Sequence, residues 1–175
     1  MKIAKYLGAV LLILVILFLS VGLAVPTFDY ASSVTINAPI EKCWTVLQDT
    51  SRMKGWVEGF ERMTLKEGEA GKSGAVYELV IQQDKRYVMQ ETVIELRAPE
   101  LASFELANDV MRSKYEFKLF GEGSRTRITS VYHIEGNNMI WKSILFVSKS
   151  YLQTGSQNQL DLLKIEIESG DLQFE

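Results

Sequence analysis

Two glutamates four residues apart, Glu91 and Glu95, are the acidic side chains best spaced for chemistry. Both fall in a strand predicted over Arg86–Arg97, where residues at even spacing lie on one face of the sheet. If one of them is buried in a cavity, such a pair can supply acid–base catalysis to a polyketide. A pair of this kind is also typical of a solvated sheet face, and the spacing alone leaves both interpretations open.

The other reactive side chains form no catalytic or metal-binding motif. His133 is the single histidine, and on the face that it shares with Arg127 and Thr129 it is expected to point to solvent. Cys43, the single cysteine, falls in an apolar helix stripe and is expected to behave as a small buried hydrophobe. The sequence contains no G-x-S-x-G, H-E-x-x-H or phosphate-binding glycine motif. We therefore assign no catalytic residue, no metal site and no cofactor, and we expect binding rather than catalysis.

Aromatic side chains are numerous where they could line a binding cavity. Phenolic hydroxyls set among apolar walls suit an amphipathic ligand with a few polar atoms. Filling the core is the alternative role for any one of these rings. The aromatic residues expected on the concave side of the sheet or under the helices are Trp44, Trp56, Tyr77, Phe104, Tyr115, Phe117, Tyr132 and Tyr151.

Length and composition narrow the class of protein. The 175 residues are 47% hydrophobic and carry a formal net charge of −3. That length suits one domain with an appendage, and the apolar content is too high for a disordered chain. The negative charge argues against a nucleic-acid partner, because binding to phosphates needs a basic face.

Residues 7–25 form an uncharged apolar segment in which Ser20 is the one polar side chain. As a helix this segment reaches about 28 Å, close to the thickness of the hydrocarbon core of a bilayer. We expect an uncleaved transmembrane anchor. The alternatives are a cleaved signal peptide, with Gly22-Leu23-Ala24 as its cleavage site, and a buried core helix.

The charges that flank this segment predict its orientation. Lys2 and Lys5 precede it, and Asp29 is the first charge after it. Because positive residues stay on the cytoplasmic side, residues 1–6 are expected to form a cytoplasmic stub. The domain that follows the linker 26–29 then lies outside, in the periplasm or the extracellular space. The expected location is the cell membrane, with a single pass.

Residues 30–170 are expected to form one α+β domain. A strand over residues 30–37 is followed by two short helices, of which the first has an apolar stripe from Ile40 to Leu47 and the second ends near Trp56. Alternation of polar and apolar side chains then predicts an antiparallel sheet with one wet face. Its strands are predicted at Phe60–Lys66, Ala75–Gln82, Arg86–Arg97, Leu101–Ala107, Met111–Phe120 and Arg125–Glu135.

The last element is a long helix, predicted from about Asn138 to Ser169 with Gly170 as its stop. Small and polar side chains, among them Thr154 and Gly155, interrupt its apolar stripe. A kink or break at Gly155 explains the interruption. Alternatively, the helix crosses a cavity there.

Two segments carry a family resemblance. Val34–Trp44 (VTINAPIEKCW) is similar to a V-x-I-x-A-P/S-x-E-x-V-W entry into a first helix, with Cys43 in place of the usual valine, and Leu160–Glu168 (LDLLKIEIE) is similar to an LK-x-x-I/L-E ending. These patterns, and the order of the elements over residues 30–169, resemble the START-like or SRPBCC superfamily, which includes polyketide cyclases and lipid-transfer domains.

The resemblance implies the helix-grip fold, in which a curved antiparallel sheet of about seven strands wraps the long C-terminal helix and leaves a hydrophobic cavity between them. The residues then expected to bind a ligand are Trp56, Tyr77, Leu79, Phe104, Tyr115, Phe117, Tyr132, Tyr151, Thr154 and Gly155. The chief hypothesis is a membrane-anchored domain that binds a hydrophobic small molecule such as a lipid, an isoprenoid or a polyketide-like compound. The alternatives are a polyketide cyclase or dehydratase, and a partner-binding module whose cavity is collapsed.

Overall fold

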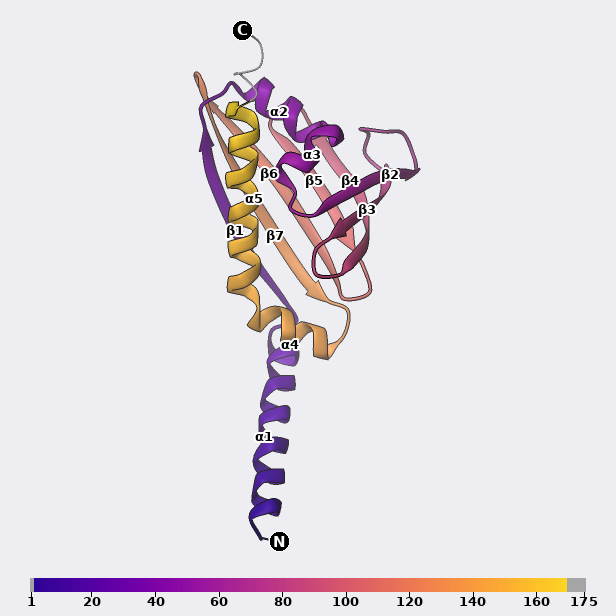
Figure 1. Cartoon of the computed structure of the whole chain (residues 1–175), viewed down its shortest axis with the longest axis vertical. Coiled ribbons are helices and arrows are strands. Elements are labelled where there is room, and N and C mark those ends of the chain that lie inside the picture. The colour runs from indigo at the N-terminus through magenta and orange to yellow at the C-terminus, as the bar shows by residue number, and fades with distance from the viewer. Residues whose placement is uncertain (1, 170–175) are drawn as a thin grey trace.

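The computed structural model describes residues 2–169, which form a long N-terminal helix joined to an α+β domain (Figure 1). Helix α1 (Lys2–Ala24) projects from one end of the domain. The C-terminal helix α5 lies along a seven-stranded sheet, and α2 and α3 lie at the end of the domain far from α1. This arrangement confirms the predicted helix-grip fold. The helices of the domain are α2 (Ile40–Gln48), the 3-10 helix η1 (Thr50–Arg52), α3 (Met53–Trp56), α4 (Met139–Val147) and α5 (Lys149–Ser169).

The strands form one antiparallel sheet in the order β1-β7-β6-β5-β4-β3-β2. They are β1 (Thr27–Ile36), β2 (Phe60–Glu67), β3 (Val76–Gln82), β4 (Arg86–Arg97), β5 (Leu101–Ala107), β6 (Met111–Glu122) and β7 (Arg125–Gly136). Each predicted strand is present. β1 begins three residues earlier than expected, because residues 27–29, which we had expected in the linker, pair with residues 133–135 of β7.

The C-terminal helix is divided at Ser148, and α5 continues through Gly155, so the first of the two alternatives for that position, a kink or break, is wrong. The two helices pack on different surfaces, which explains the division. Leu145 of α4 belongs to a small apolar cluster with β1 and β7, whereas Leu163 of α5 belongs to the main core. Gly170, the expected helix stop, lies outside the described residues.

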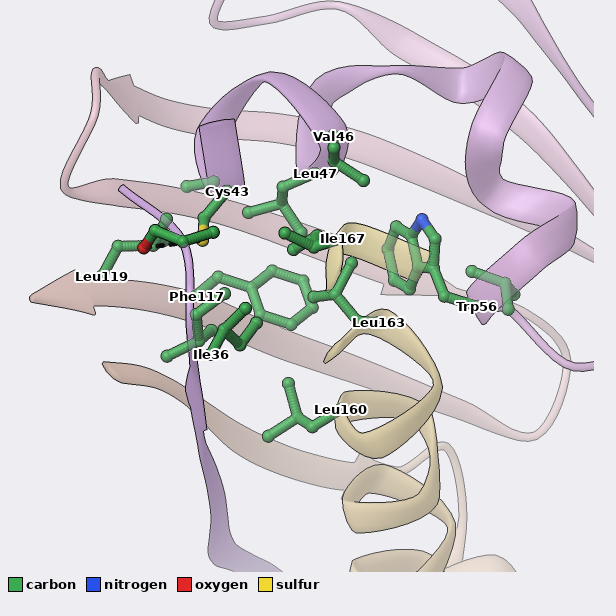
Figure 2. Close-up of a cluster of buried hydrophobic side chains, with 14 residues drawn as sticks. Ile36, Cys43, Val46, Leu47, Trp56, Phe117, Leu119, Leu160, Leu163 and Ile167 are labelled. Atoms are coloured by element: carbon green, nitrogen blue, oxygen red, sulfur yellow. Dashed lines mark hydrogen bonds between the residues drawn. The ribbon is translucent and has the colours of Figure 1, made fainter. Parts of the chain in front are cut away.

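The main core joins α2, α3 and the C-terminal half of α5 to the sheet (Figure 2). Ile36 of β1 and Ile167 of α5 are fully buried in it. Trp56 of α3 and Phe117 of β6 meet edge to face, with ring centroids 6.4 Å apart. Burial of each such side chain stabilises the fold by about 1.5–3 kcal/mol, and together these contacts fix α3 over one end of the sheet.

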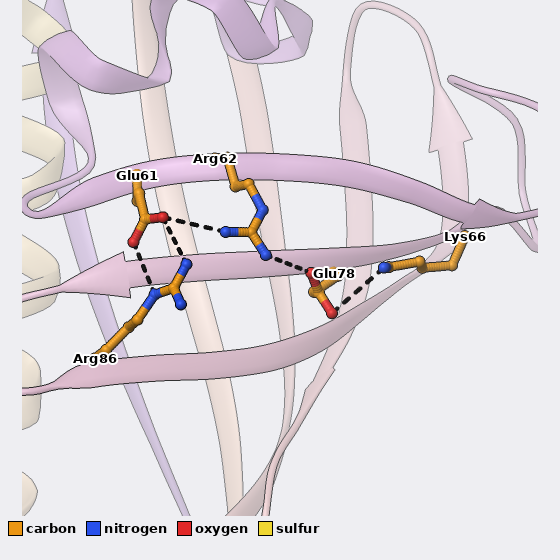
Figure 3. Close-up of polar contacts among 5 residues, drawn as sticks. All are labelled: Glu61, Arg62, Lys66, Glu78 and Arg86. Atoms are coloured by element: carbon orange, nitrogen blue, oxygen red, sulfur yellow. Dashed lines mark hydrogen bonds and ion pairs between the residues drawn. The ribbon is translucent and has the colours of Figure 1, made fainter.

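Charged side chains link the strands at the β2 edge of the sheet (Figure 3). Glu61 accepts hydrogen bonds from Arg86 at 2.6 and 2.9 Å, and Glu78 accepts one from Arg62 at 2.8 Å. Exposed ion pairs of this kind contribute little to stability, because water screens the charges. Charge on an edge strand also disfavours pairing with another chain.

Helix α1 is held against α4 at Gly22. Gly22 N donates a hydrogen bond to Ser143 Oγ at 3.0 Å. A Cβ at position 22 would lie 2.6 Å from both Met139 O and Ser143 Oγ, so glycine permits this approach. Lys5–Ala24, within α1, is long and apolar enough to cross a membrane.

Candidate functional site

A row of four stacked aromatic rings crosses the sheet. Tyr30, Tyr132, Tyr115 and Phe104 lie directly opposite one another on β1, β7, β6 and β5. Neighbouring ring centroids are 4.9, 5.6 and 5.1 Å apart. Residues opposite one another on adjacent strands have their Cβ atoms about 5 Å apart, so the strand register brings the rings together. The row forms an apolar wall that carries phenolic hydroxyls.

One cavity, which we call the α3 cavity, lies between α3, the end of α2 and the β2–β3 loop, and has a volume of about 360 Å³. Its lining includes Gln48 of α2, Trp56 of α3 and Gly71 of the loop. Gly71 N donates a hydrogen bond to Tyr77 Oη at 3.0 Å. This bond holds the glycine-rich loop at the cavity.

A second cavity, which we call the α5 cavity, lies between the sheet and the N-terminal half of α5 and also measures about 360 Å³. Leu79 and Tyr132 line it from the sheet, and Tyr151 and Gly155 line it from the helix. Gly155 is exposed, and a Cβ added there would meet no atom within 4 Å, so this position forms an open rim. The interruption of the apolar stripe therefore corresponds to a cavity and not to a break.

The two cavities meet around one cluster of side chains. They share Met53, Trp56, Glu91, Tyr115 and Phe117 as lining residues. Four of these five side chains are apolar or aromatic, so Glu91 is the acidic group at the junction.

Glu91 is 3% exposed, and one of its carboxylate oxygens accepts a hydrogen bond from Tyr115 Oη. Burial raises the pKa of Glu91 to about 7, and the bond from Tyr115 opposes that rise. Burial also raises the pKa of Tyr115 well above its ordinary value, so the phenol remains protonated and donates. Glu91 can therefore gain or lose a proton near neutral pH.

Glu95 does not share the face of Glu91, so the expectation of a carboxylate pair on one face is wrong. A β-bulge between Val93 and Glu95, in the pairing of β4 with β5, adds one residue to β4. The added residue reverses the alternation of side chains beyond it. Leu96 consequently lines the α3 cavity, and Glu95 is exposed.

Three buried side-chain atoms among residues 2–169 have no hydrogen-bond partner within the protein: Gln48 Nε2, Trp56 Nε1 and Ser113 Oγ. Gln48 and Trp56 line the α3 cavity, and Ser113 lines the α5 cavity. Buried polar groups are usually paired in native proteins. The gathering of these three at the cavities makes them part of the site.

The structure brings together nine of the ten side chains predicted to bind a ligand. Tyr77 and Phe104 line the α3 cavity; Leu79, Tyr132, Tyr151 and Gly155 line the α5 cavity; and Trp56, Tyr115 and Phe117 line both. Thr154 lines neither. It is exposed, and its hydroxyl donates a hydrogen bond to Ser150 O at 3.0 Å. On a continuous helix, position 154 is turned about 100° from position 155, which explains the difference.

The remaining candidate groups lie away from the cavities. His133 is exposed, as expected, and its Nδ1 lies 2.5 Å from Asp29 Oδ1. Cys43 is buried in the main core, and Trp44 packs half-buried against that core. Within the part of the chain that the structure describes, no group of three or more His, Cys, Asp or Glu side chains could hold a metal ion.

Sequence analysis missed Tyr30, Gln48, Gly71 and Ser113 as lining residues. A usable signal existed for Ser113, which lies two residues before Tyr115 and so shares its face of β6. The other three residues depend on the register of β1, on the point where α2 ends and on the path of the β2–β3 loop. The sequence carries no comparable signal for these.

A curved antiparallel sheet that grips one long helix, with cavities between the two layers, defines the class of helix-grip domains. Within that class, the chain belongs to the family described as polyketide cyclase / dehydrase and lipid transport, which matches residues 27–168.

Solved structures share this fold at low sequence identity. The Zhui aromatase/cyclase from Streptomyces sp. R1128 has a TM-score of 0.69 at 14% identity, over 82% of this chain and 94% of that one. Norcoclaurine synthase from Thalictrum flavum, a point mutant in complex with a transition-state analogue, has a TM-score of 0.63 at 11% identity, over 83% and 96%. Ara h 8.0201 has a TM-score of 0.65 at 12% identity, over 82% and 99%. No protein with a curated description matches the sequence.

Proposed function

We propose that this domain binds one apolar small molecule, such as a lipid, an isoprenoid or a polyketide-like compound, across the α3 and α5 cavities. The observation that carries the proposal is that two largely apolar cavities of about 360 Å³ each meet at Glu91 and Tyr115. Cavities of this size are typical of small-molecule sites. Burial of apolar ligand surface in them is worth about 25 cal/mol per Å². The family's description, which includes lipid transport, agrees with this class of ligand.

The proposal includes anchoring to the cell membrane through α1, with the domain on the outer side. The length and apolar character of α1 support a membrane span, and the positions of Lys5 at its N-terminal end and of Asp29 after it support the orientation. The contact between Gly22 and Ser143 favours an uncleaved helix. Cleavage after Ala24 would remove the helix against which α4 packs.

An exposed apolar row on α4 supports the same arrangement. Ile140 and Val147, which are 55% and 67% exposed, lie three and four residues from Ser143 and therefore on the helix face that meets α1. Tyr151, near the start of α5, is 80% exposed and lines the α5 cavity. Beside a membrane-spanning α1, such a row would lie in the bilayer interface. The rim of the α5 cavity would then open at the membrane surface.

Alkaline carbonate extraction of membranes from cells that express the full-length protein tests the anchor. Full-length protein that stays in the membrane pellet agrees with a retained α1. Recovery of a shortened soluble form that begins near Val25 would contradict it. Protease added to intact spheroplasts tests the side of the membrane, because an outer domain would be digested.

A matched pair of variants in α5 tests ligand binding. Gly155→Phe places a ring on the open rim of the α5 cavity, and Thr154→Phe places the same ring one position away on the exposed surface. We expect full-length protein in detergent micelles to bind a fluorescent isoprenoid. Gly155→Phe should weaken that binding about tenfold or more, which corresponds to about 1.4 kcal/mol. Thr154→Phe should leave it unchanged.

Thermal unfolding of both variants shows whether the domain remains folded. Wild-type protein that binds neither the isoprenoid nor another apolar probe would contradict the proposed function. Equal binding by wild type and Gly155→Phe would show that the α5 cavity is not the entrance.

Glu91 favours a second candidate function, proton-transfer catalysis of the cyclase or dehydratase type. A carboxyl with a pKa of about 7 can remove a proton from the carbon beside a ketone at neutral pH. In the dehydration of a β-hydroxy ketone, that C–H bond and the C–O bond to the hydroxyl break, and an enone and water form. Enone formation from a long-chain β-hydroxy ketone by wild type, and its loss in Glu91→Gln, would support catalysis. Binding of this compound without turnover by wild type would count against it.

A further inference from the structure

Two residues that line the α3 cavity, Trp56 and Gln48, carry unpaired buried donors that indicate the chemistry of its ligand. Trp56 is 4% exposed, and neither its Nε1 nor Gln48 Nε2 has a partner within the protein. Figure 2 shows the indole nitrogen on the edge of the ring that faces away from Leu163. A buried donor left unpaired costs about 1–3 kcal/mol. A ligand that pairs these donors therefore recovers free energy that the protein alone does not.

The two groups require an acceptor. An indole N–H can only donate, and the Nε2 of a glutamine side chain carries two hydrogens and accepts none. Gln48 ends α2, Trp56 ends α3, and η1 lies between the two helices, so one short stretch of chain brings both side chains to one cavity. Both residues therefore line the cavity in which the acceptor oxygen of a ligand would lie.

The charges of the side chains that line the two cavities indicate whether the acceptor on the ligand is neutral or anionic. Their lining includes Glu91 and Glu58 and, among the described residues, no lysine or arginine. A carboxylate or phosphate on the ligand would be buried beside Glu91 without a counter-charge, which is costly. A neutral carbonyl oxygen does not incur this cost and still accepts two hydrogen bonds.

We infer that the α3 cavity binds an uncharged carbonyl oxygen, as in a long-chain ketone, an ester or a quinone, through Trp56 and Gln48. The apolar remainder of the molecule extends into the α5 cavity past Phe117. The inference rests on the proposed binding function. It narrows the ligand class to neutral carbonyl compounds, in preference to fatty acids and hydrocarbons.

A competition experiment at pH 8 tests the inference. Full-length protein in micelles with the bound fluorescent isoprenoid is titrated with a long-chain methyl ketone, the alkane of the same length and the corresponding fatty acid. The measured quantity is the ratio of the alkane and ketone inhibition constants. Because this ratio is compared between variants, partition of each compound into the micelles cancels. In wild type, once each inhibition constant is corrected for the measured partition of the compound into the micelles, we expect the ketone to bind about tenfold more tightly than the alkane, and the acid more weakly than the ketone.

Two variants remove the donors while keeping apolar bulk. Trp56→Phe and Gln48→Met should each lower the preference for the ketone over the alkane about three- to tenfold. Trp44→Phe is the matched control, because Trp44 packs against the core and is not among the lining residues of either cavity. It should keep the full preference.

The outcomes separate this inference from the proposed function. If the isoprenoid does not bind, the proposed function itself fails. If the isoprenoid binds but ketone and alkane compete equally in wild type, or if both donor variants keep the preference, the inference is overturned and the proposed function stands. Tighter binding of the acid than of the ketone would likewise overturn it.

Discussion

The two halves of α5 face the same sheet, but the C-terminal half packs into the main core and the N-terminal half borders an open cavity. In the C-terminal half, Leu160, Leu163 and Ile167 are at most 1% exposed and complete the main core. In the N-terminal half, the buried position is taken by Ser156, a small side chain, and Gly155 lies on the rim of the α5 cavity. The backbone is helical throughout. Side-chain volume therefore decides where the core ends and the cavity begins, which separates stability from binding along one helix.

The largest effect should come from removing side-chain volume in the packed half. Leu163 is fully buried, so Leu163→Ala should lower the free energy of unfolding by about 2–5 kcal/mol. Urea unfolding of the full-length protein in micelles measures this loss. Affinity for the isoprenoid should stay unchanged under conditions where the variant is folded. Loss of binding by the folded variant would mean that the two halves are not separable.

A second effect on stability should come from Glu91 of β4, which lines the cavity beside the N-terminal half of α5. Glu91 is buried there without a basic partner among the lining residues. Its pKa rises from 4.5 to about 7 on folding. The folded protein therefore holds the proton more tightly, and stability falls as the pH rises from about 4.5 to 7. The loss amounts to about 3 kcal/mol and is complete above pH 7.

Glu91→Gln cannot titrate and should lack this fall. The free energy of unfolding of Glu91→Gln minus that of wild type should therefore become more positive from pH 5 to pH 8. Urea unfolding at several pH values provides the measurement. Parallel pH profiles for the two proteins would show that Glu91 is not a buried acid.

A smaller effect on stability is expected at Gly155, on the rim of the α5 cavity. Gly155→Ala should raise stability by about 0.5–1 kcal/mol, because alanine favours the helix and its Cβ meets no atom within 4 Å. A methyl group is too small to close the rim, so isoprenoid affinity should be kept. Thermal unfolding and probe titration of the same preparation test both expectations. A loss of stability would indicate that position 155 is glycine for a reason of backbone packing.

The smallest effect on stability is expected at His133, which lies on β7 away from α5. His133 is exposed, and its contact with Asp29 lies on the surface. His133→Ala should change the free energy of unfolding by less than about 0.5 kcal/mol and should not affect binding. A larger change in either measurement would contradict its assignment to the solvent face.

The strands and most of the cavity wall could be predicted because alternation records which side chains share a face. Phe117 is buried and lines both cavities as expected, and Tyr115, on the same face of β6, also lines both. Alternation does not record where a strand gains a residue. The bulge near Val93 therefore hid the fact that Glu91 and Glu95 face opposite sides.

The break in the C-terminal helix escaped prediction for a related reason. The glycine at position 155 is the local signal for a break, but the helix divides at Ser148. The division follows from packing, because α4 contacts α1 and the end of the sheet whereas α5 runs along the sheet. The surface on which α4 or α5 packs is set by the tertiary structure and is not indicated by the local sequence.

Only Val25 and Pro26 separate α1 from β1, and the contact between Gly22 and Ser143 clamps α1 to α4. A domain attached in this way has no hinge. With α1 in a bilayer, the domain would move by lateral diffusion, and the rim of the α5 cavity would keep one height and one tilt above the lipid. Its search for a ligand would then be two-dimensional, and any soluble acceptor of that ligand would have to approach from one fixed direction.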